Sequence, residues 1–173
     1  MKGKGPMDTQ DLVLELTTEM LHLAFPERRT SDIRSKLMAD LASGQALDAF
    51  KRVITAQGGD CRFVDDPSAM GSARYHTTIE AECSGYLEKI DVQQLGYGII
   101  SLGGGRTHKD QQIDTTVGLS GLQRQGCWFD AGEALCTIHA NSQEANQTAL
   151  RQIKQAFIVG EKHRVDTLIR TTM

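Results

Sequence analysis

The sequence is poor in proline and aromatic residues, and it has no excess of charge of either sign. Its 173 residues include three prolines and one tryptophan, and aromatic side chains make up 5% of the total. A formal net charge of −3 gives no broad electrostatic attraction for nucleic acid or for an anionic membrane. We therefore expect neither of these as a partner.

Long hydrophobic runs are also missing. The N-terminal residues 1–6 are basic, but no apolar segment of the kind found in signal peptides follows them. The apolar residues of the stretch 12–24 are interrupted by charged and polar ones, which excludes a membrane span there. With 39% hydrophobic and 24% charged residues, the composition is ordinary for a globular protein. We expect a cytoplasmic location.

The cysteines and histidines show no pattern of a metal site. None of Cys61, Cys83, Cys127 and Cys136 forms a C-x-x-C pair, and their spacing fits no common zinc motif. The five histidines are scattered over the chain without acidic or cysteine residues at ligand spacing. We predict reduced thiols, no metal and no cofactor.

Residues 8–57 have the apolar spacing of three short amphipathic helices. The first is expected to be capped by Asp8 or Thr9, and the second by Thr30 or Ser31. Their ends are predicted at the proline at position 26 and at the glycines at positions 44 and 58. Three such helices make a thin layer that needs a further surface to cover its apolar side.

From about residue 65 the apolar pattern changes to a period of two, which indicates β structure. The domain boundary is therefore predicted near 65–73, with helical residues 1–64 before it and an α+β domain over 65–173. The expected helices cover 92–102 and 142–158, the latter capped by Ser142. The expected strands are 75–82, 85–90, 117–122 and 134–140, the last two around a hairpin at 126–132, and a closing strand at Val165–Ile169.

The segment Gly103-Gly104-Gly105-Arg106 is the first candidate for chemistry. Consecutive glycines let backbone N–H groups approach an anion closely, and Arg106 adds a bidentate donor. No Lys-Ser or Lys-Thr follows as in a P-loop, so a structural turn is the preferred interpretation and phosphate binding the alternative. Lys109 and the histidine before it are interpreted as solvated loop residues, with an acid–base pair as the alternative.

Other candidates have simpler structural interpretations. Asp65 and Asp66 precede a proline, which favours a capped turn over a catalytic dyad. Cys127 has no base beside it in the sequence. The segments 80–90 and 126–135 also resemble lipoyl and biotinyl carrier domains, but Lys89 lies inside an expected strand and Lys109 lacks the usual neighbours of a modified lysine. We expect no such modification.

Three motifs, in order, resemble the C-terminal part of the thymidine phosphorylase and pyrimidine-nucleoside phosphorylase family. They are Ala56–Asp60 with Asp65–Pro67, then Ser101–Gly118 with its GGGR and Ile-Asp elements, and then Gly132–Ala140. The resemblance runs from about Lys2 to the C-terminus.

The resemblance implies the last helices of a helical domain followed by a hammerhead-like α/β domain with a mixed sheet. Members of the family convert a pyrimidine nucleoside and phosphate to the base and ribose or deoxyribose 1-phosphate. Their phosphate- and base-binding motifs precede the matching segment, so no residue is carried over as catalytic, and the loop Gly103–Arg106 falls in the domain that closes over the cleft. The chain alone is expected to be inactive, with phosphate and nucleoside bound only in the full enzyme.

Two hypotheses follow. The first is a non-catalytic portion of a nucleoside phosphorylase, whether a fragment, a truncated gene product or one half of a split enzyme. The second is a stand-alone anion-binding or interaction module that reuses the α/β domain. The helices of residues 8–57 favour the first hypothesis, because a free module has no use for helices that lack packing partners. We expect such helices to self-associate.

Overall fold

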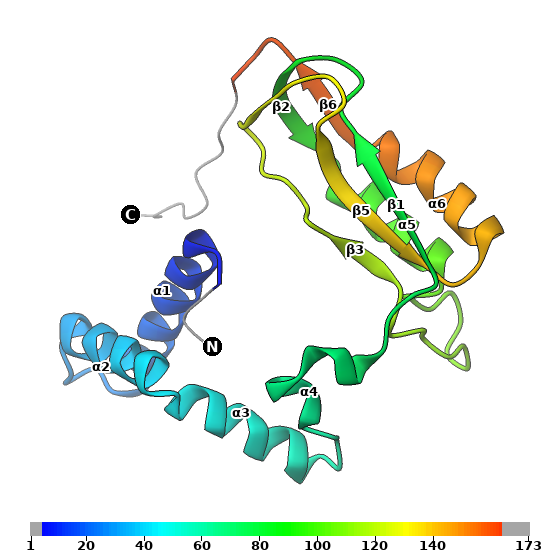
Figure 1. The fold of residues 1–173 in the computed structure, drawn as a ribbon. Helices are drawn as coiled ribbons and strands as arrows, with labels where there is room; N and C mark the ends of the chain where they lie inside the picture. The colour runs from blue at the N-terminus through cyan, green and yellow to red at the C-terminus, as the bar shows by residue number, and fades with distance from the viewer. Residues whose placement is uncertain (1–4, 164–173) are drawn as a thin grey trace. The chain divides into compact units, whose positions relative to one another are not determined.

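The computed structural model describes residues 5–163. They form two units, a helical one up to Asp66 and one of mixed helix and strand from Pro67 onward (Figure 1). The closing strand predicted at Val165–Ile169 lies outside the described residues.

The first unit confirms the three predicted helices. Gly44 ends the second helix and begins the third, with a left-handed φ of +84° that glycine adopts without strain. Because Gln45 follows at once as the first residue of the third helix, this single glycine makes the whole turn. The helices are α1 (Met7–Ala24), α2 (Thr30–Ser43), α3 (Gln45–Ala56) and a short α4 (Arg62–Asp65) that the sequence analysis missed.

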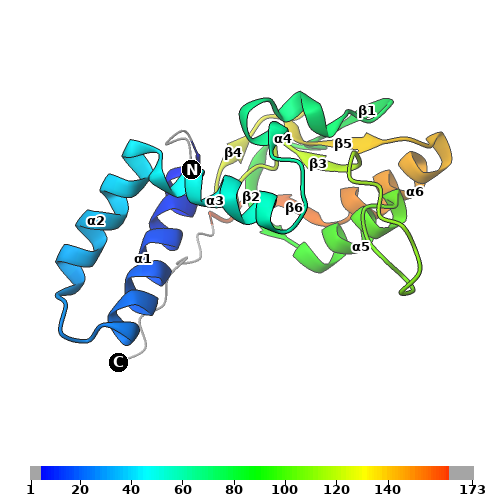
Figure 2. The same cartoon turned by 90° about the horizontal axis from the view of Figure 1, so that it is seen from below.

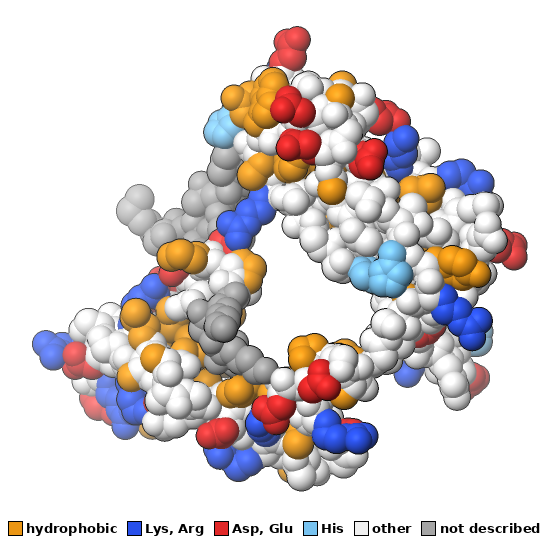
Figure 3. Space-filling model, in the orientation of Figure 1, with side chains coloured by type: hydrophobic (Ala, Val, Ile, Leu, Met, Phe, Trp, Pro, Cys, Tyr) orange, Lys and Arg blue, Asp and Glu red, His pale blue; other side chains and the backbone are white. Residues whose placement is uncertain are grey.

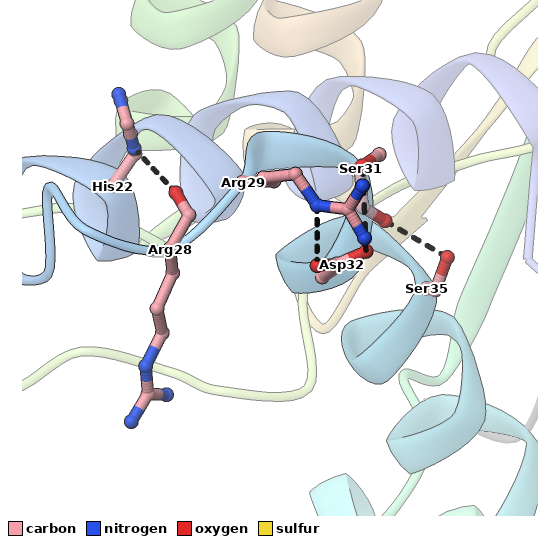
Figure 4. A network of polar contacts seen from close by, with 6 residues as sticks. All are labelled: His22, Arg28, Arg29, Ser31, Asp32 and Ser35. Carbon is pink, nitrogen blue, oxygen red and sulfur yellow. Dashed lines mark hydrogen bonds and ion pairs between the residues drawn. The ribbon is translucent and has the colours of Figure 1, made fainter.

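The predicted side-chain caps of α1 and α2 are wrong. Pro6 precedes α1 and Arg29 precedes α2, and neither helix start has a side-chain cap hydrogen bond. In the first turn of α2 the guanidinium of Arg29 donates to both carboxylate oxygens of Asp32, at 2.9 and 3.1 Å (Figure 4). Nearby, the Nδ1 atom of His22 donates to the carbonyl of Arg28 at 3.1 Å. A carboxylate near the helix N-terminus, held by an arginine, replaces the expected hydroxyl cap.

Helix α1 leaves much of its apolar surface uncovered. It buries Leu14 and Thr18, whereas Leu16, Met20 and Leu23 are 57%, 68% and 82% exposed. Figure 3 shows hydrophobic side chains over this helix. The three exposed residues are spaced by four and three positions, so they form one stripe along the helix.

Within the described residues, the second unit contains two three-stranded sheets. Their orders are β1-β5-β3 and β4-β2-β6, and every described pairing is antiparallel, so the expected mixed sheet is replaced by two antiparallel ones. A short 3₁₀ turn (Pro67–Met70) precedes them. The strands are β1 (Tyr75–Glu80), β2 (Gly85–Ile90), β3 (Gly118–Ser120), β4 (Trp128–Phe129), β5 (Ala134–Ala140) and β6 (Phe157–Gly160).

Two predicted elements of this unit need correction. Strands β3 and β5 do pair, but the chain between them crosses to the other sheet, where β4 pairs with β2, instead of forming a simple hairpin. The helix predicted over 142–158 ends earlier, as α6 (Gln143–Lys154), although its predicted cap Ser142 is confirmed. Phe157 starts strand β6, which pairs with β2 and satisfies the backbone there.

Helices α5 (Val92–Leu102) and α6 lie side by side against the sheet β1-β5-β3 (Figures 1 and 2). Leu87, Ile138 and Ile153 are fully buried in the core that these layers enclose. In the described part of the chain, no helix combines the length and apolar character that crossing a bilayer requires.

Candidate functional site

The glycine loop begins as the C-terminal cap of α5. Gly103 has a left-handed φ of +94°, and its N–H donates to the carbonyl of Ile100 at 2.9 Å. The N–H of Gly104 reaches one turn further back, to the carbonyl of Ile99 at 3.0 Å. This pair of bonds is a common way for a helix to end at glycine. Both N–H groups are therefore already used within the chain.

The next two glycines allow the loop to fold back on the helix. A Cβ atom on Gly104 would lie 2.8 Å from Cγ2 of Ile99, and one on Gly105 would lie 2.6 Å from Cγ1 of Ile100. The loop also follows the C-terminal end of the helix, whose partial negative charge does not favour an anion. This geometry accounts for three successive glycines without a ligand. That the loop binds no phosphate remains a prediction.

The side chains after the glycines lie on the surface. Arg106 and Lys109 are both exposed. Between them, the backbone N–H and the hydroxyl of Thr107 donate to the Gln111 side-chain oxygen at 2.9 and 2.8 Å. The Thr107–Gln111 bonds give this part of the loop a defined shape, with its two cations available to solvent or a partner.

Asp114 joins the loop to the rest of the unit. Its N–H donates to the carbonyl of Gly103 at 2.9 Å. One carboxylate oxygen accepts from the N–H and the hydroxyl of Thr116, at 3.0 and 2.7 Å, and the other accepts from the Asn141 amide at 2.7 Å. These hydrogen bonds hold the pKa of Asp114 below its usual value, and the bond from Asn141 contributes most.

Asn141 extends this network to the start of β1. It follows β5, and its side-chain oxygen accepts the N–H of Arg74 at 2.9 Å, while its amide also donates to the Thr116 hydroxyl at 2.7 Å. The Asn141 side chain thus joins three segments that are far apart in the sequence. We call Asp114, Thr116 and Asn141 the Asp114 network.

A second polar cluster lies on the sheet β1-β5-β3. His76 of β1 and His139 of β5 are register partners, and their ring centroids are 4.7 Å apart. The Nε2 atom of His139 is 2.6 Å from the hydroxyl oxygen of Ser120 on β3. Burial, and then the neighbouring His76, lower the pKa of His139. No local sequence pattern reveals this cluster, because only the pairing of β1 with β5 brings the two histidines together.

The other residues that the sequence suggested for chemistry make contacts of a purely structural kind. Asp65 closes α4 and accepts from Nζ of Lys51 at 2.7 and 2.9 Å, and this bond raises the pKa of Lys51. Cys127 is exposed, whereas Cys136 is buried and its pKa is raised to about 11. Lys89 lies within β2, as predicted, and not at a hairpin tip. Among residues 5–163 no three metal-binding side chains gather, and the lack of a metal in the protein stays a prediction.

The first unit has a hollow of its own. About 820 Å³ lies between α1, α2 and α3, with a mostly apolar lining that includes Val13, Leu37, Met38 and Leu41. Its volume is in the range of small-molecule sites, and its lining also includes polar residues such as Gln10, Asp48 and Arg52. It continues the uncovered apolar side of these helices.

Comparison with known proteins gives a consistent result for both units. Residues 86–159 match the family model of the pyrimidine nucleoside phosphorylase C-terminal domain. The pyrimidine-nucleoside phosphorylase of Geobacillus stearothermophilus is 34% identical over 169 residues, which are 98% of this chain and 39% of that protein. That of Bacillus subtilis (strain 168) is 33% identical over 161 residues, which are 93% of this chain and 37% of that protein.

The second unit is thus an α+β domain of the type found at the C-terminus of nucleoside phosphorylases. The chain belongs to the pyrimidine-nucleoside phosphorylase family, to whose C-terminal part it corresponds. It spans about two fifths of the length of the relatives named above.

Proposed function

We propose that this chain supplies the C-terminal part of a pyrimidine-nucleoside phosphorylase, which transfers the pentosyl group of a pyrimidine nucleoside to phosphate. The match of proteins of that name to 98% of the chain is the observation that carries the proposal. It covers the helical unit as well as the α+β unit. A module that had reused only the α+β domain would not need the first.

The chain alone is proposed to be inactive. Among residues 67–163, the polar clusters offer no set of groups that would hold both a phosphate and a base: the N–H groups of Gly103 and Gly104 are occupied, and Asp114 is bound by its own neighbours. The binding groups would then come from the portion of the relatives that this chain does not match. Four free thiols, one of them buried, support the proposal that the protein works in the reducing cytoplasm.

The uncovered side of α1 to α3 is the proposed contact for that other portion. Its apolar hollow and the stripe of Leu16, Met20 and Leu23 would be covered by further helices of a phosphorylase helical domain. The alternative, a stand-alone anion-binding or interaction module, loses support because the glycine N–H groups expected to bind the anion cap a helix instead.

The test is release of uracil or thymine from uridine or thymidine in the presence of phosphate. The chain is assayed alone and after refolding with the part of the Geobacillus stearothermophilus relative that it does not match. We expect no release by the chain alone and release by the mixture. A Leu16→Glu/Met20→Glu variant should fail to restore activity, whereas Gln143→Glu/Gln147→Glu, which adds the same charge to an exposed side of α6, should restore it. Release by the chain alone would contradict the proposal.

A further inference from the structure

The exposed face of the sheet β4-β2-β6 has an aromatic platform. Tyr86 of β2 and Trp128 of β4 are register partners, and their rings make an edge contact with centroids 5.0 Å apart and planes at 82°. His163 makes a similar edge contact with Tyr86, with centroids 5.1 Å apart and planes at 70°. Trp128 is 53% exposed, whereas the next residue along the strand, Phe129, is buried. The indole is therefore on the outer face and available to a ligand.

Carboxylates flank this aromatic pair. The Glu88 carboxylate lies against Gly160, the register partner of Tyr86, and Asp130 follows strand β4, two residues after Trp128. Asp130 is 3.4 Å from the indole N–H, which donates to it, and its own N–H donates to Glu133 at 2.7 Å. The segment 126–133 around Trp128 contains two acidic residues and no lysine or arginine, whereas Arg124 and the exposed Lys89 and Lys162 lie outside it. Over β2 and β6, Figure 3 shows hydrophobic side chains bordered by acidic ones.

Glu88 is held at the edge of the platform. Its Oε1 atom accepts the N–H of Lys162 at 2.8 Å. Gly160, opposite Tyr86 in β6, leaves room for this carboxylate, because a Cβ at position 160 would overlap Oε1 of Glu88. Ile158 of the same strand is 49% exposed and extends the apolar surface.

These groups match the chemistry of an arginine side chain. A guanidinium stacks on an indole through cation–π attraction and forms paired hydrogen bonds with a carboxylate. The exposed apolar surface accommodates the aliphatic stem of such a side chain. The same carboxylates repel a phosphate or a nucleotide, so the platform is not suited to an anionic ligand.

We propose that Trp128, Tyr86 and Asp130 form a docking surface for an arginine-bearing segment of a partner protein. The proposal does not rest on the phosphorylase function, since it uses no residue of the loop after α5 or of the first unit. Charge complementarity selects the occupant: an aromatic face with carboxylates on both sides recognises a cation with an apolar stem.

The chain has a single tryptophan, so its fluorescence reports directly on this surface. The probe is the peptide acetyl-Gly-Arg-Gly-amide, titrated against the full chain, with the neutral isostere acetyl-Gly-citrulline-Gly-amide as the control ligand. We expect saturable quenching in the millimolar range by the arginine peptide and affinity at least about tenfold lower for citrulline. An equal response to both peptides, or none up to about 20 mM, would overturn the proposal.

Variants separate this site from general charge attraction. Asp130→Asn keeps the fluorophore and should weaken binding of the arginine peptide at least about threefold, while Asp110→Asn, in an exposed loop, should leave it unchanged. An equal effect of the two substitutions would refute a specific contact. Uridine is the third ligand: binding as tight as that of the arginine peptide would show a nucleobase-stacking surface and would reject a protein partner.

Discussion

Asp114 is a single carboxylate whose hydrogen bonds fix the position of the loop after α5. Replacing Asp114 by Asn puts an amide NH2 group against either the Asn141 amide or the Thr116 donors, so at least one partly buried donor loses its acceptor. We expect the free energy of unfolding of the second unit to fall by about 1–2 kcal/mol. Urea denaturation followed by Trp128 fluorescence measures this, because the only tryptophan lies in that unit.

The pH dependence of the Asp114 variant gives a second check on the same residue. A depressed pKa in the folded state means that the unfolded state binds the proton more readily, so the stabilisation is present above the unfolded pKa near 3.8 and is lost as pH falls through the folded value. The loss caused by Asp114→Asn should therefore be full at pH 6 and shrink below pH 4. The control, Asp110→Asn, lies in the same exposed loop, and an equal loss there would contradict the role of the network.

The pKa of His139 is lowered, as that of Asp114 is, but protonation gives His139 a positive charge, whereas it neutralises Asp114. Because its folded pKa lies below 6.5, the unfolded chain takes up a proton first, and the second unit should lose stability as pH falls from about 7 to 5. His139→Gln removes the titration and should flatten this part of the stability curve, whose slope for one group is at most about 1.4 kcal/mol per pH unit. His108→Gln in the exposed loop should leave the slope unchanged; if both variants flatten it equally, the assignment to His139 is wrong.

At the scale of elements, two glycines of α5 have opposite roles. A Cβ on Gly98 would overlap the buried side chain of Ile153 on α6, whereas a Cβ on Gly96 would meet nothing within 4 Å. Gly98→Ala is therefore expected to destabilise the second unit by about 1–3 kcal/mol through overpacking. Gly96→Ala should stabilise it by about 0.5–1 kcal/mol, since alanine is the better helix former. Urea denaturation of both variants tests the pair, and stabilisation by both would show that α5 and α6 are not in close contact.

The elements differ in how far the sequence alone predicts them. Apolar spacing and a terminal proline or glycine are enough to predict α1, α2, α3 and α5, because these signals are local. Strand β6 was missed, since Phe157 also fits the apolar face of the preceding helix and only pairing with β2 decides between the two. The crossing of the chain between β3 and β5 was missed for the same reason, as no local signal says which sheet a two-residue strand joins.

For the candidate sites too, local features can be predicted from the sequence, whereas features made by long-range pairing cannot. The residue types alone identify the glycine loop. Its interpretation as a structural turn agrees with the two hydrogen bonds, from the N–H groups of Gly103 and Gly104, that end α5. The His76–His139 pair and the Asp114 network were not found, because each joins residues that are distant in the sequence and meet only through sheet register. Residue type is visible in the sequence, but the long-range strand pairing that brings these side chains together is not.

At the scale of the whole molecule, the uncovered side of the first unit makes the chain prone to self-association. Leu16, Met20 and Leu23 expose an apolar stripe on α1, and the hollow between α1, α2 and α3 adds further apolar surface to the same unit. Without another helical surface, a second copy of the chain is the available cover, and burying such side chains contributes about 1.5–3 kcal/mol each. We expect the molar mass measured by light scattering to rise with protein concentration.

A pair of charge-matched variants assigns that association to the stripe. Leu16→Glu/Met20→Glu places two carboxylates in it, and burying them unpaired would cost far more than the lost apolar contact. This variant should remain a monomer at concentrations where the original chain associates, while Gln143→Glu/Gln147→Glu, with the same added charge on α6, should associate as before. Leu16→Glu/Met20→Glu lies outside the second unit, so unchanged urea denaturation of that unit, followed by Trp128 fluorescence, shows that its effect arises in the first. If the original chain is a monodisperse monomer, or if both variants dissociate alike, then the apolar stripe is not the contact.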